Sequence, residues 1–154
     1  MKEVILNHPL VTHKLSVLRD KRTHTKEFKE LISEISMLLC YEAMKDVKLH
    51  DTTIETPLEK YETKCVHEDD YAFIPILRAG LGMVDGILKV MPIAKVGHIG
   101  LYRNEETLEP VEYYYKVPEN IDKREVFVLD PMLATGGSAI ATINRLKQDG
   151  VKKI

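Results

Sequence analysis

The hydrophobic pattern in the first third of the chain predicts a long helix. Apolar side chains recur there at three- and four-residue spacing, which places them on one buried face. They are Phe28, Leu31, Ile32, Ile35, Leu38 and Leu39. We expect Thr25 to cap this helix and the helix to reach about Met44. Residues 1–24 mix polar and apolar side chains, which predicts an arm with one short helical turn.

Three later segments are too continuously apolar to alternate between two faces. They are residues 71–77, 94–102 and 125–129. Such runs are typical of strands that are buried on both sides, as in a parallel sheet. A helix is expected after the first strand, over residues 81–90, and another after the third, from about Gly136 to Asp149. The inner face of this last helix is expected to carry Ile140, Ile143 and Leu146.

Shorter segments complete the predicted topology. Residues 52–56 and 61–66 predict two short strands on either side of Pro57, and residues 111–117 predict another strand. Strands that alternate with helices form doubly wound sheets. We therefore predict an α/β fold with a doubly wound, mainly parallel sheet, an N-terminal helical arm and a small β excursion. The length of 154 residues suits a single domain, residues 1–154.

The charge balance argues against a large nucleic-acid interface. The chain has 22 basic and 24 acidic residues, so it lacks the basic excess that binding to a phosphate backbone requires. No run approaches the ~20 apolar residues of a membrane span, and the polar N-terminus is unlike a secretory signal. We therefore predict a cytoplasmic protein that binds neither nucleic acid nor membrane, with Cys40 and Cys65 as reduced thiols.

The strongest chemical signal lies between the third apolar strand and the helix that follows it. The strand ends at Asp130, and Thr135-Gly136-Gly137-Ser138 then opens the helix. The glycines allow backbone amides to approach an anion, the two hydroxyls add donors, and the helix N-terminus adds about half a positive charge. The segment therefore predicts a phosphate-binding cup, with the Asp130 carboxylate beside it to bind ribose hydroxyls or a magnesium ion.

Other phosphate-binding loops do not match this segment. No Gly-Lys-Ser/Thr follows, as a Walker loop requires, and a dinucleotide fingerprint needs three glycines at a fixed spacing. Two arginines, Arg78 and Arg103, each follow an apolar strand and are expected at the same sheet edge as Asp130. From the residues alone they are either surface ion pairs or clamps for a diphosphate, whose oxygens match guanidinium forks.

These residues resemble a known family. The family's phosphoribosyl-diphosphate loop is matched by Asp130, Pro131, Met132, Leu133, Ala134, Thr135, Gly136, Gly137 and Ser138. The family is that of the type I phosphoribosyltransferases, most of which have two adjacent acids where this chain has Asp130-Pro131. The Asp-Pro form is similar to the uracil phosphoribosyltransferase branch, and residues 8–11, 75–83 and 102–110 agree with that branch.

The resemblance implies a reaction and its residues. Members of the branch transfer the phosphoribosyl group of 5-phosphoribosyl 1-diphosphate to uracil, which gives UMP and diphosphate in pyrimidine salvage. The residues that match Arg78 and Arg103 contact the diphosphate, and those that match residues 130–138 hold the ribose and its 5-phosphate. Arg78, Arg103 and Asp130 are therefore the expected catalytic residues, with magnesium as cofactor. The resemblance also implies a homo-oligomer, a dimer or larger, and in some members a GTP effector.

The end of the chain departs from the family pattern. Only the four residues from Val151 to Ile154 follow the last helix and its terminal glycine, whereas family members continue for several dozen residues that include a uracil-recognition segment. We therefore expect the uracil-binding residues to lie beyond Ile154, with none in this chain. We also expect a sheet that is incomplete in its C-terminal part, weak or no turnover and marginal stability. Two alternatives stay open: a non-catalytic regulator that senses phosphoribosyl diphosphate, and transfer to another nucleobase.

Overall fold

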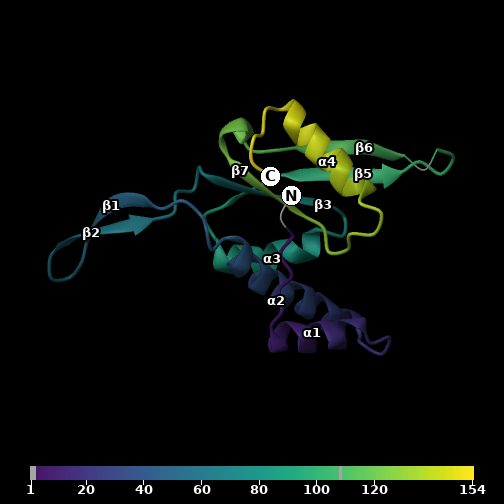
Figure 1. Ribbon diagram of the computed structural model, residues 1–154, viewed down its shortest axis with the longest axis horizontal. Helices are drawn as coiled ribbons and strands as arrows, with labels where there is room; N and C mark the ends of the chain where they lie inside the picture. Colours follow the sequence, from purple (N-terminus) through teal and green to yellow (C-terminus); the bar gives the residue numbers. More distant parts are fainter. Residues whose placement is uncertain (1–2, 108) are drawn as a thin grey trace.

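The fold is built on a mixed sheet whose central strand is β3 (Tyr71–Leu77). The computed structural model describes residues 3–107 and 109–154. β7 (Glu125–Leu129) pairs in parallel with one edge of β3, and β4 (Lys95–Val96) and β5 (His98–Arg103) pair in parallel with the other. β6 (Pro110–Lys116) lies antiparallel to β5 at the outer edge (Figure 1). The predicted, mainly parallel sheet is confirmed.

β4 and β5 replace the single strand that was expected over residues 94–102. Both keep one register against β3, so they follow one line along its edge. Gly97 interrupts the ladder between them, although its amide still donates to the Phe73 carbonyl at 3.0 Å. A Cβ at Gly97 would lie 2.7 Å from Ile74 Cδ1. The break therefore falls where the core leaves no room for a side chain on the strand.

Helices cover both faces of the sheet, as a doubly wound fold requires (Figure 1). α2 (Thr25–Ala43) and α3 (Leu81–Val90) lie below the sheet in that view, and α4 (Gly137–Gln148) lies above it. α1 (Pro9–Arg19) packs against α2 on the side away from the sheet. A short 3-10 turn, Ile121–Lys123, leads into β7. The predicted fold class, a sheet with helices on both faces, is thus confirmed.

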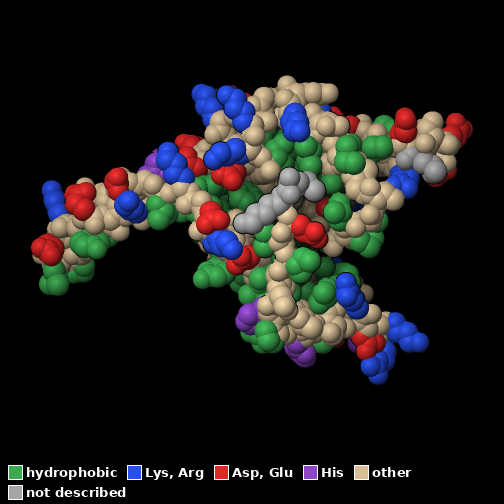
Figure 2. Space-filling model, viewed as in Figure 1, with side chains coloured by type: hydrophobic (Ala, Val, Ile, Leu, Met, Phe, Trp, Pro, Cys, Tyr) green, Lys and Arg blue, Asp and Glu red, His purple; other side chains and the backbone are tan. Residues whose placement is uncertain are grey.

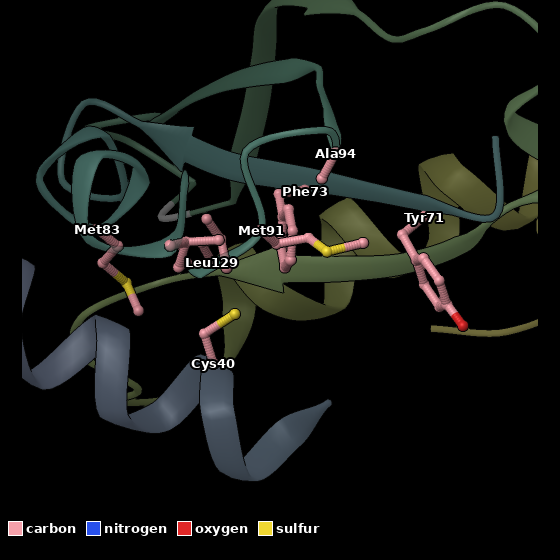
Figure 3. Close-up of a cluster of buried hydrophobic side chains, with 8 residues drawn as sticks. Cys40, Tyr71, Phe73, Met83, Met91, Ala94 and Leu129 are labelled. Atoms are coloured by element: carbon pink, nitrogen blue, oxygen red, sulfur yellow. The ribbon is translucent and has the colours of Figure 1, made fainter. Parts of the chain in front are cut away.

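Side chains along β3 alternate between two hydrophobic cores, one on each face of the sheet. Tyr71 and Phe73 belong to the core that includes α2 and α3, whereas Ala72, Ile74 and Ile76 belong to the core under α4. All five are buried, which explains the absence of polar positions in this run. Figure 3 shows the first core, which consists of Cys40, Tyr71, Phe73, Met83, Ile87, Met91, Ala94 and Leu129.

The inner face of α4 differs from the prediction. Leu146 and Thr142 are fully buried, Ile143 is half-buried, and Ile140 is 58% exposed. Residues 142 and 146 are four apart and share one face of the helix. Ile140 precedes Thr142 by two residues, or about 200° around the helix axis, and so points away from the sheet. The placement of Ile140 on the inner face was wrong.

The last residues of the chain lie beside β7. Lys153 forms an isolated parallel bridge with Glu125, and its carbonyl accepts a hydrogen bond from the Val126 amide at 3.0 Å. Val151 is buried in the core under α4, whereas the side chain of Ile154 is exposed. The segment from Val151 to Ile154 therefore pairs with β7 at a single position and forms no full strand of the sheet.

A full helix occupies the region where one short turn was expected. α1 runs over Pro9–Arg19, and the His8 Nδ1 atom caps it by accepting a backbone amide hydrogen bond at 3.2 Å. A proline in the first turn has the φ angle that a helix needs. Lys14 Nζ lies 2.6 Å from Glu34 Oε2 of α2. Because only Val11 of α1 is buried, the segment lacks the apolar stripe that would have revealed it.

Two details predicted for α2 are wrong. His24 rather than Thr25 occupies the cap position, and its side chain makes no capping hydrogen bond. Phe28 and Leu39 are exposed, whereas the small Ser36 is buried. The helices α2 and α3 approach each other closely. A Cβ on one glycine of α3 would come within 1.9 Å of the backbone of α2.

The predicted β excursion is confirmed as a hairpin. β1 (His50–Glu55) and β2 (Lys60–Cys65) pair antiparallel on either side of Pro57. The hairpin projects from the body of the molecule as an arm (Figure 1). Hydrophobic side chains are visible at its tip (Figure 2), where Leu58 is 95% exposed.

Two further properties concern the thiols and the helices. Both cysteines are free; Cys40 is buried in the first core and Cys65 is exposed on the arm. Within residues 3–107 and 109–154, no helix combines the length and the apolar character needed to cross a membrane.

Candidate active site

Three parallel strands bring the predicted site residues to one edge of the sheet. Arg78 directly follows β3, Arg103 is the last residue of β5, and Asp130 directly follows β7. The strands pair side by side and run in the same direction, so these three residues share the carboxyl edge. Ligands bind at that edge in doubly wound folds. The predicted placement is therefore confirmed.

The 130–138 loop joins β7 to α4 and is exposed over most of its length. Asp130 Oδ1 accepts a hydrogen bond from the Met132 amide at 3.2 Å, which fixes the first turn of the loop. Gly136 has a φ of 77°, in the left-handed region that favours glycine. Its carbonyl then accepts a hydrogen bond from the Ile140 amide at 2.9 Å and starts α4.

The start of α4 forms an open cup. A Cβ on Gly137 would meet only Thr135 Oγ1, at 3.8 Å, so nothing crowds the first amides of the helix. The first turn carries no acidic side chain to neutralise the positive end of the helix dipole. The cup is a hollow of about 80 Å³ whose lining includes Arg103, Asp130 and the loop residues from Met132 to Ser138.

Arg103 reaches this cup from β5. Its Nη2 atom lies 3.4 Å from Thr135 Oγ1, a long hydrogen bond that joins parts of the chain 32 residues apart. Within the described residues Arg103 is exposed and forms no ion pair with a carboxylate. Its guanidinium therefore keeps donors for an anion that enters the cup. The loop and Arg103 form one site.

Arg78 lies in a neighbouring hollow rather than in the cup. This second hollow has a volume of about 670 Å³ and is lined by Leu77, Arg78, Ala79, Leu101, Tyr102 and Tyr113. It shares the carboxyl edge with the cup but has no lining residue in common with it. The structure thus brings Arg103 into contact with the loop, and it places Arg78 beside them without such a contact.

Two tyrosines beside Arg78 were not predicted as site residues. Tyr113 is 54% exposed, and its ring covers Gly100 of β5. The ring of Tyr102 lies nearby, with 6.3 Å between the two ring centroids. The available signal was Gly100, because a glycine inside a buried strand often marks the close approach of another group.

Comparisons with known proteins decide the family. A family model described as uracil phosphoribosyltransferase matches residues 4–154. The chain belongs to the uracil phosphoribosyltransferase family. It is 58% identical over 153 residues to a uracil phosphoribosyltransferase of Clostridioides difficile, covering 99% of this chain and 73% of that relative. It is 57% identical over 150 residues to one of Streptococcus pneumoniae, covering 97% and 72%.

A solved structure gives the same result for the fold. A protein from Aquifex aeolicus matches with a TM-score of 0.89 and 40% sequence identity, over 97% of this chain and 72% of that one. The resemblance that the loop suggested is thereby confirmed. The roles of single residues in this uracil phosphoribosyltransferase family member, including Arg78, Arg103 and Asp130, stay predictions. The same holds for the expectation that the uracil-binding residues lie beyond Ile154.

A magnesium ion fits this site only together with a substrate. Among the described residues, no three His, Cys, Asp or Glu side chains gather as a metal site. The carboxylate in the cup is that of Asp130, and one of its oxygens binds the Met132 amide. Mg²⁺ is often held by one or two carboxylates, substrate phosphate oxygens and waters. The donor set therefore suits an ion that arrives with a diphosphate.

Proposed function

We propose that this chain transfers the phosphoribosyl group of 5-phosphoribosyl 1-diphosphate to uracil and forms UMP and diphosphate, a reaction of pyrimidine salvage. Family membership supports the reaction. The observation that carries the site is the 3.4 Å contact between Arg103 and Thr135 at the open cup. It joins a cation suited to a diphosphate with a helix start suited to a phosphate.

In the proposed complex, the 130–138 loop binds the 5-phosphate and the ribose. The first amides of α4 and the hydroxyls of Thr135 and Ser138 donate hydrogen bonds to phosphate oxygens. Asp130 accepts hydrogen bonds from ribose hydroxyls. Arg103 and Arg78 bind the diphosphate on the other side of the sugar. Together these contacts hold the anomeric carbon in place for attack.

The chemical step replaces one bond at that carbon with another. The bond to the diphosphate oxygen breaks, a uracil ring nitrogen bonds to the carbon, and the proton of that nitrogen is released. Negative charge grows on the diphosphate as the sugar gains oxocarbenium character. Arg78 and Arg103 stabilise this charge more in the transition state than in the ground state, which is the condition for catalysis.

Magnesium is part of the proposal. Asp130 is the residue that would hold the ion, in combination with phosphate oxygens and waters. When bound, the ion supplies further positive charge for the leaving diphosphate.

The proposal extends to the partners that the family resemblance implies. We propose a cytoplasmic homo-oligomer, a dimer or larger, with GTP as an effector. Sedimentation velocity of the full chain distinguishes a monomer from an oligomer, and a GTP titration measures any change in the affinity for phosphoribosyl diphosphate. A monomer at all concentrations, or an affinity that GTP leaves unchanged, contradicts these parts without affecting the proposed reaction.

Product formation under single-turnover conditions tests the reaction. The full chain, in molar excess over phosphoribosyl diphosphate, is incubated with magnesium and uracil, and nucleotides are detected by mass spectrometry. Excess protein makes a slow turnover visible. We expect UMP, and no nucleotide from orotate or hypoxanthine in matched reactions. Another preferred base overturns the uracil assignment, and no nucleotide from any base overturns the reaction.

A further inference from the structure

The helix that carries the cup is anchored mainly at its far end. Thr142 and Leu146, its two fully buried residues, lie in its middle and last turns. Its first turn includes the exposed Ile140, and the loop before it is exposed as well. The position of the cup therefore depends on how firmly the C-terminal half of α4 is held.

A polar network holds that half to β6. Tyr115 Oη of β6 donates to Asp149 Oδ2 at 2.6 Å, just past the end of α4. Arg145 Nη1 of α4 donates to Asp149 Oδ1 at 2.5 Å. The guanidinium carbon of Arg145 also lies 3.9 Å from the centroid of the Tyr115 ring, and Arg145 Nε lies 3.4 Å from Glu112 Oε2. One arginine thus contacts two residues of β6 and one at its own helix end.

The protonation of the network matches this geometry. Burial, together with the hydrogen bond to Asp149, raises the pKa of Tyr115, so the phenol stays a donor. Burial alone would raise the pKa of Asp149, but the hydrogen bonds from Tyr115 and Arg145 outweigh it and lower that pKa. The hydrogen bond to Asp149 raises the pKa of Arg145. The Asp149 carboxylate is therefore charged at neutral pH and accepts two hydrogen bonds.

The network joins α4 to β6, the neighbour of the strand that carries Arg103. β6 pairs with β5, which ends at Arg103, and α4 follows the loop that contains Thr135. From Gly137 to Asp149 the helix rises by about 18 Å, so a tilt of about 5° at the clamped end moves the cup by about 1.6 Å. The contact between Arg103 and Thr135 is already 3.4 Å long, and such a shift away from Arg103 breaks it.

We propose that Tyr115, Arg145 and Asp149 are positioning residues for the phosphoribosyl-diphosphate site. They fix the tilt of α4 against β6 and so align the cup with Arg103. They touch neither the substrate nor the reacting atoms. This inference rests on the proposed function, because it assigns the residues to the binding of that reaction's sugar substrate.

Paired substitutions of two neighbouring tyrosines test the proposal. Tyr115→Phe removes only the hydroxyl that binds Asp149, and Tyr114→Phe removes the hydroxyl of an exposed neighbour that makes no hydrogen bond within the described residues. We expect Tyr115→Phe to weaken binding of phosphoribosyl diphosphate with magnesium by about fivefold, the equivalent of one hydrogen bond. We expect Tyr114→Phe to bind like the wild type. Calorimetry well below the melting temperature of each variant measures the dissociation constants.

Asp149 offers a graded version of the same test. Asp149→Ala removes the acceptor of both hydrogen bonds, whereas Asp149→Asn keeps one acceptor oxygen, so the dissociation constant of the Asn variant should lie between those of the Ala variant and the wild type. Amide NMR shifts supply a readout that needs no substrate. Tyr115→Phe should move the resonances of residues 134–138 and Tyr114→Phe should not.

The outcomes separate this proposal from the proposed function. If the wild type does not bind phosphoribosyl diphosphate, the proposed function fails and the positioning role fails with it. If the wild type binds, but Tyr115→Phe lowers only the melting temperature and leaves the dissociation constant and the loop resonances unchanged, the network is merely structural and the inference is overturned.

Discussion

The turn after β3 and the loop after β7 leave neighbouring strands at the same sheet edge, yet they are built differently. After β3 the chain turns at once into α3, and Gly80 packs so tightly that a Cβ would lie 2.5 Å from the Leu129 carbonyl oxygen. After β7 the chain forms an exposed loop around Gly136 and Gly137, where the nearest atoms to an added Cβ are 3.8 Å away or more.

Gly80, Gly136 and Gly137 are glycines for three different reasons. Gly80 has an ordinary φ of -63°, and a glycine is required there because the packing leaves no space for a Cβ atom. Gly136 has space around it for a Cβ atom, but its φ is 77°. A glycine is therefore favoured there by the backbone conformation. Gly137 has neither constraint, and the role we propose for it is to let an anion approach the helix start. The glycine of the first turn thus serves packing, whereas we propose that Gly137 in the second serves binding.

The largest effect is expected for Gly80→Ala. The added Cβ would meet three backbone atoms, of Leu129 and Ile76, at 2.5 to 2.9 Å, and backbone cannot yield as a flexible side chain does. We expect a loss of about 3 kcal/mol in the free energy of unfolding, measured by urea denaturation. A loss below about 1 kcal/mol would show that the turn after β3 is not tightly packed.

Arg103→Ala is expected to act on binding instead. The substitution removes the charged donor at the cup but no buried contact, since Arg103 is exposed. We expect the dissociation constant for phosphoribosyl diphosphate to rise about 10- to 100-fold, as for the loss of a charged hydrogen bond. The melting temperature should change little. Calorimetry and a thermal melt of the same sample distinguish the two effects.

Gly136→Ala is expected to have a moderate effect, either on the free energy of unfolding or on the binding of phosphoribosyl diphosphate. An alanine fits the space but must adopt the left-handed conformation, which costs about 1–2 kcal/mol. The free energy of unfolding should fall by that amount. The alternative is that the loop shifts to relieve the strain, which would appear as weaker binding with unchanged stability. If both the free energy of unfolding and the binding of phosphoribosyl diphosphate stayed unchanged, the role given to the φ angle would be contradicted.

Thr142→Val is expected to be mildly stabilising. The Thr142 hydroxyl is fully buried and has no hydrogen-bond partner among the described residues. Replacing it by a methyl group of similar shape should raise the free energy of unfolding by about 1 kcal/mol. Differential scanning calorimetry measures the change. Destabilisation by a similar amount would mean that the hydroxyl is satisfied after all.

The smallest change in stability is expected for Gly137→Ala. The added Cβ would meet only Thr135 Oγ1, at an ordinary contact distance of 3.8 Å, so the free energy of unfolding should stay within about 0.5 kcal/mol of the wild type. Binding of phosphoribosyl diphosphate should nevertheless weaken, because the methyl group occupies the path to the helix amides. Equal binding by the variant would remove the distinction between Gly137 and an ordinary helix residue.

The sequence predicted the features that depend on local pattern. The run from Tyr71 to Leu77 is a strand buried on both faces because two helical layers cover it. The loop after β7 was predicted because two glycines, two hydroxyls and a helix start within nine residues together suit a phosphate. The edge at which Arg78 and Arg103 lie followed from the direction of parallel strands.

What the sequence did not predict depends on contacts between distant elements. Strand order places Arg78 at the correct edge but does not determine that Arg78 lines the hollow beside Tyr113 rather than the cup. The face that α4 turns to the sheet is set by packing, which exposes Ile140 and buries Thr142. The bond from Tyr115 to Asp149 links a strand and a helix end across 34 residues, beyond any local pattern.

The most direct test of the central claim is a calorimetric titration of the full chain with phosphoribosyl diphosphate and magnesium, run beside Arg103→Ala and Gly137→Ala. We expect saturable binding of one ligand per chain, and we expect both substitutions to weaken it while the protein stays folded. Absence of binding by the wild type, or equal affinity in all three proteins, would contradict the assignment of the cup and Arg103 as the sugar-diphosphate site.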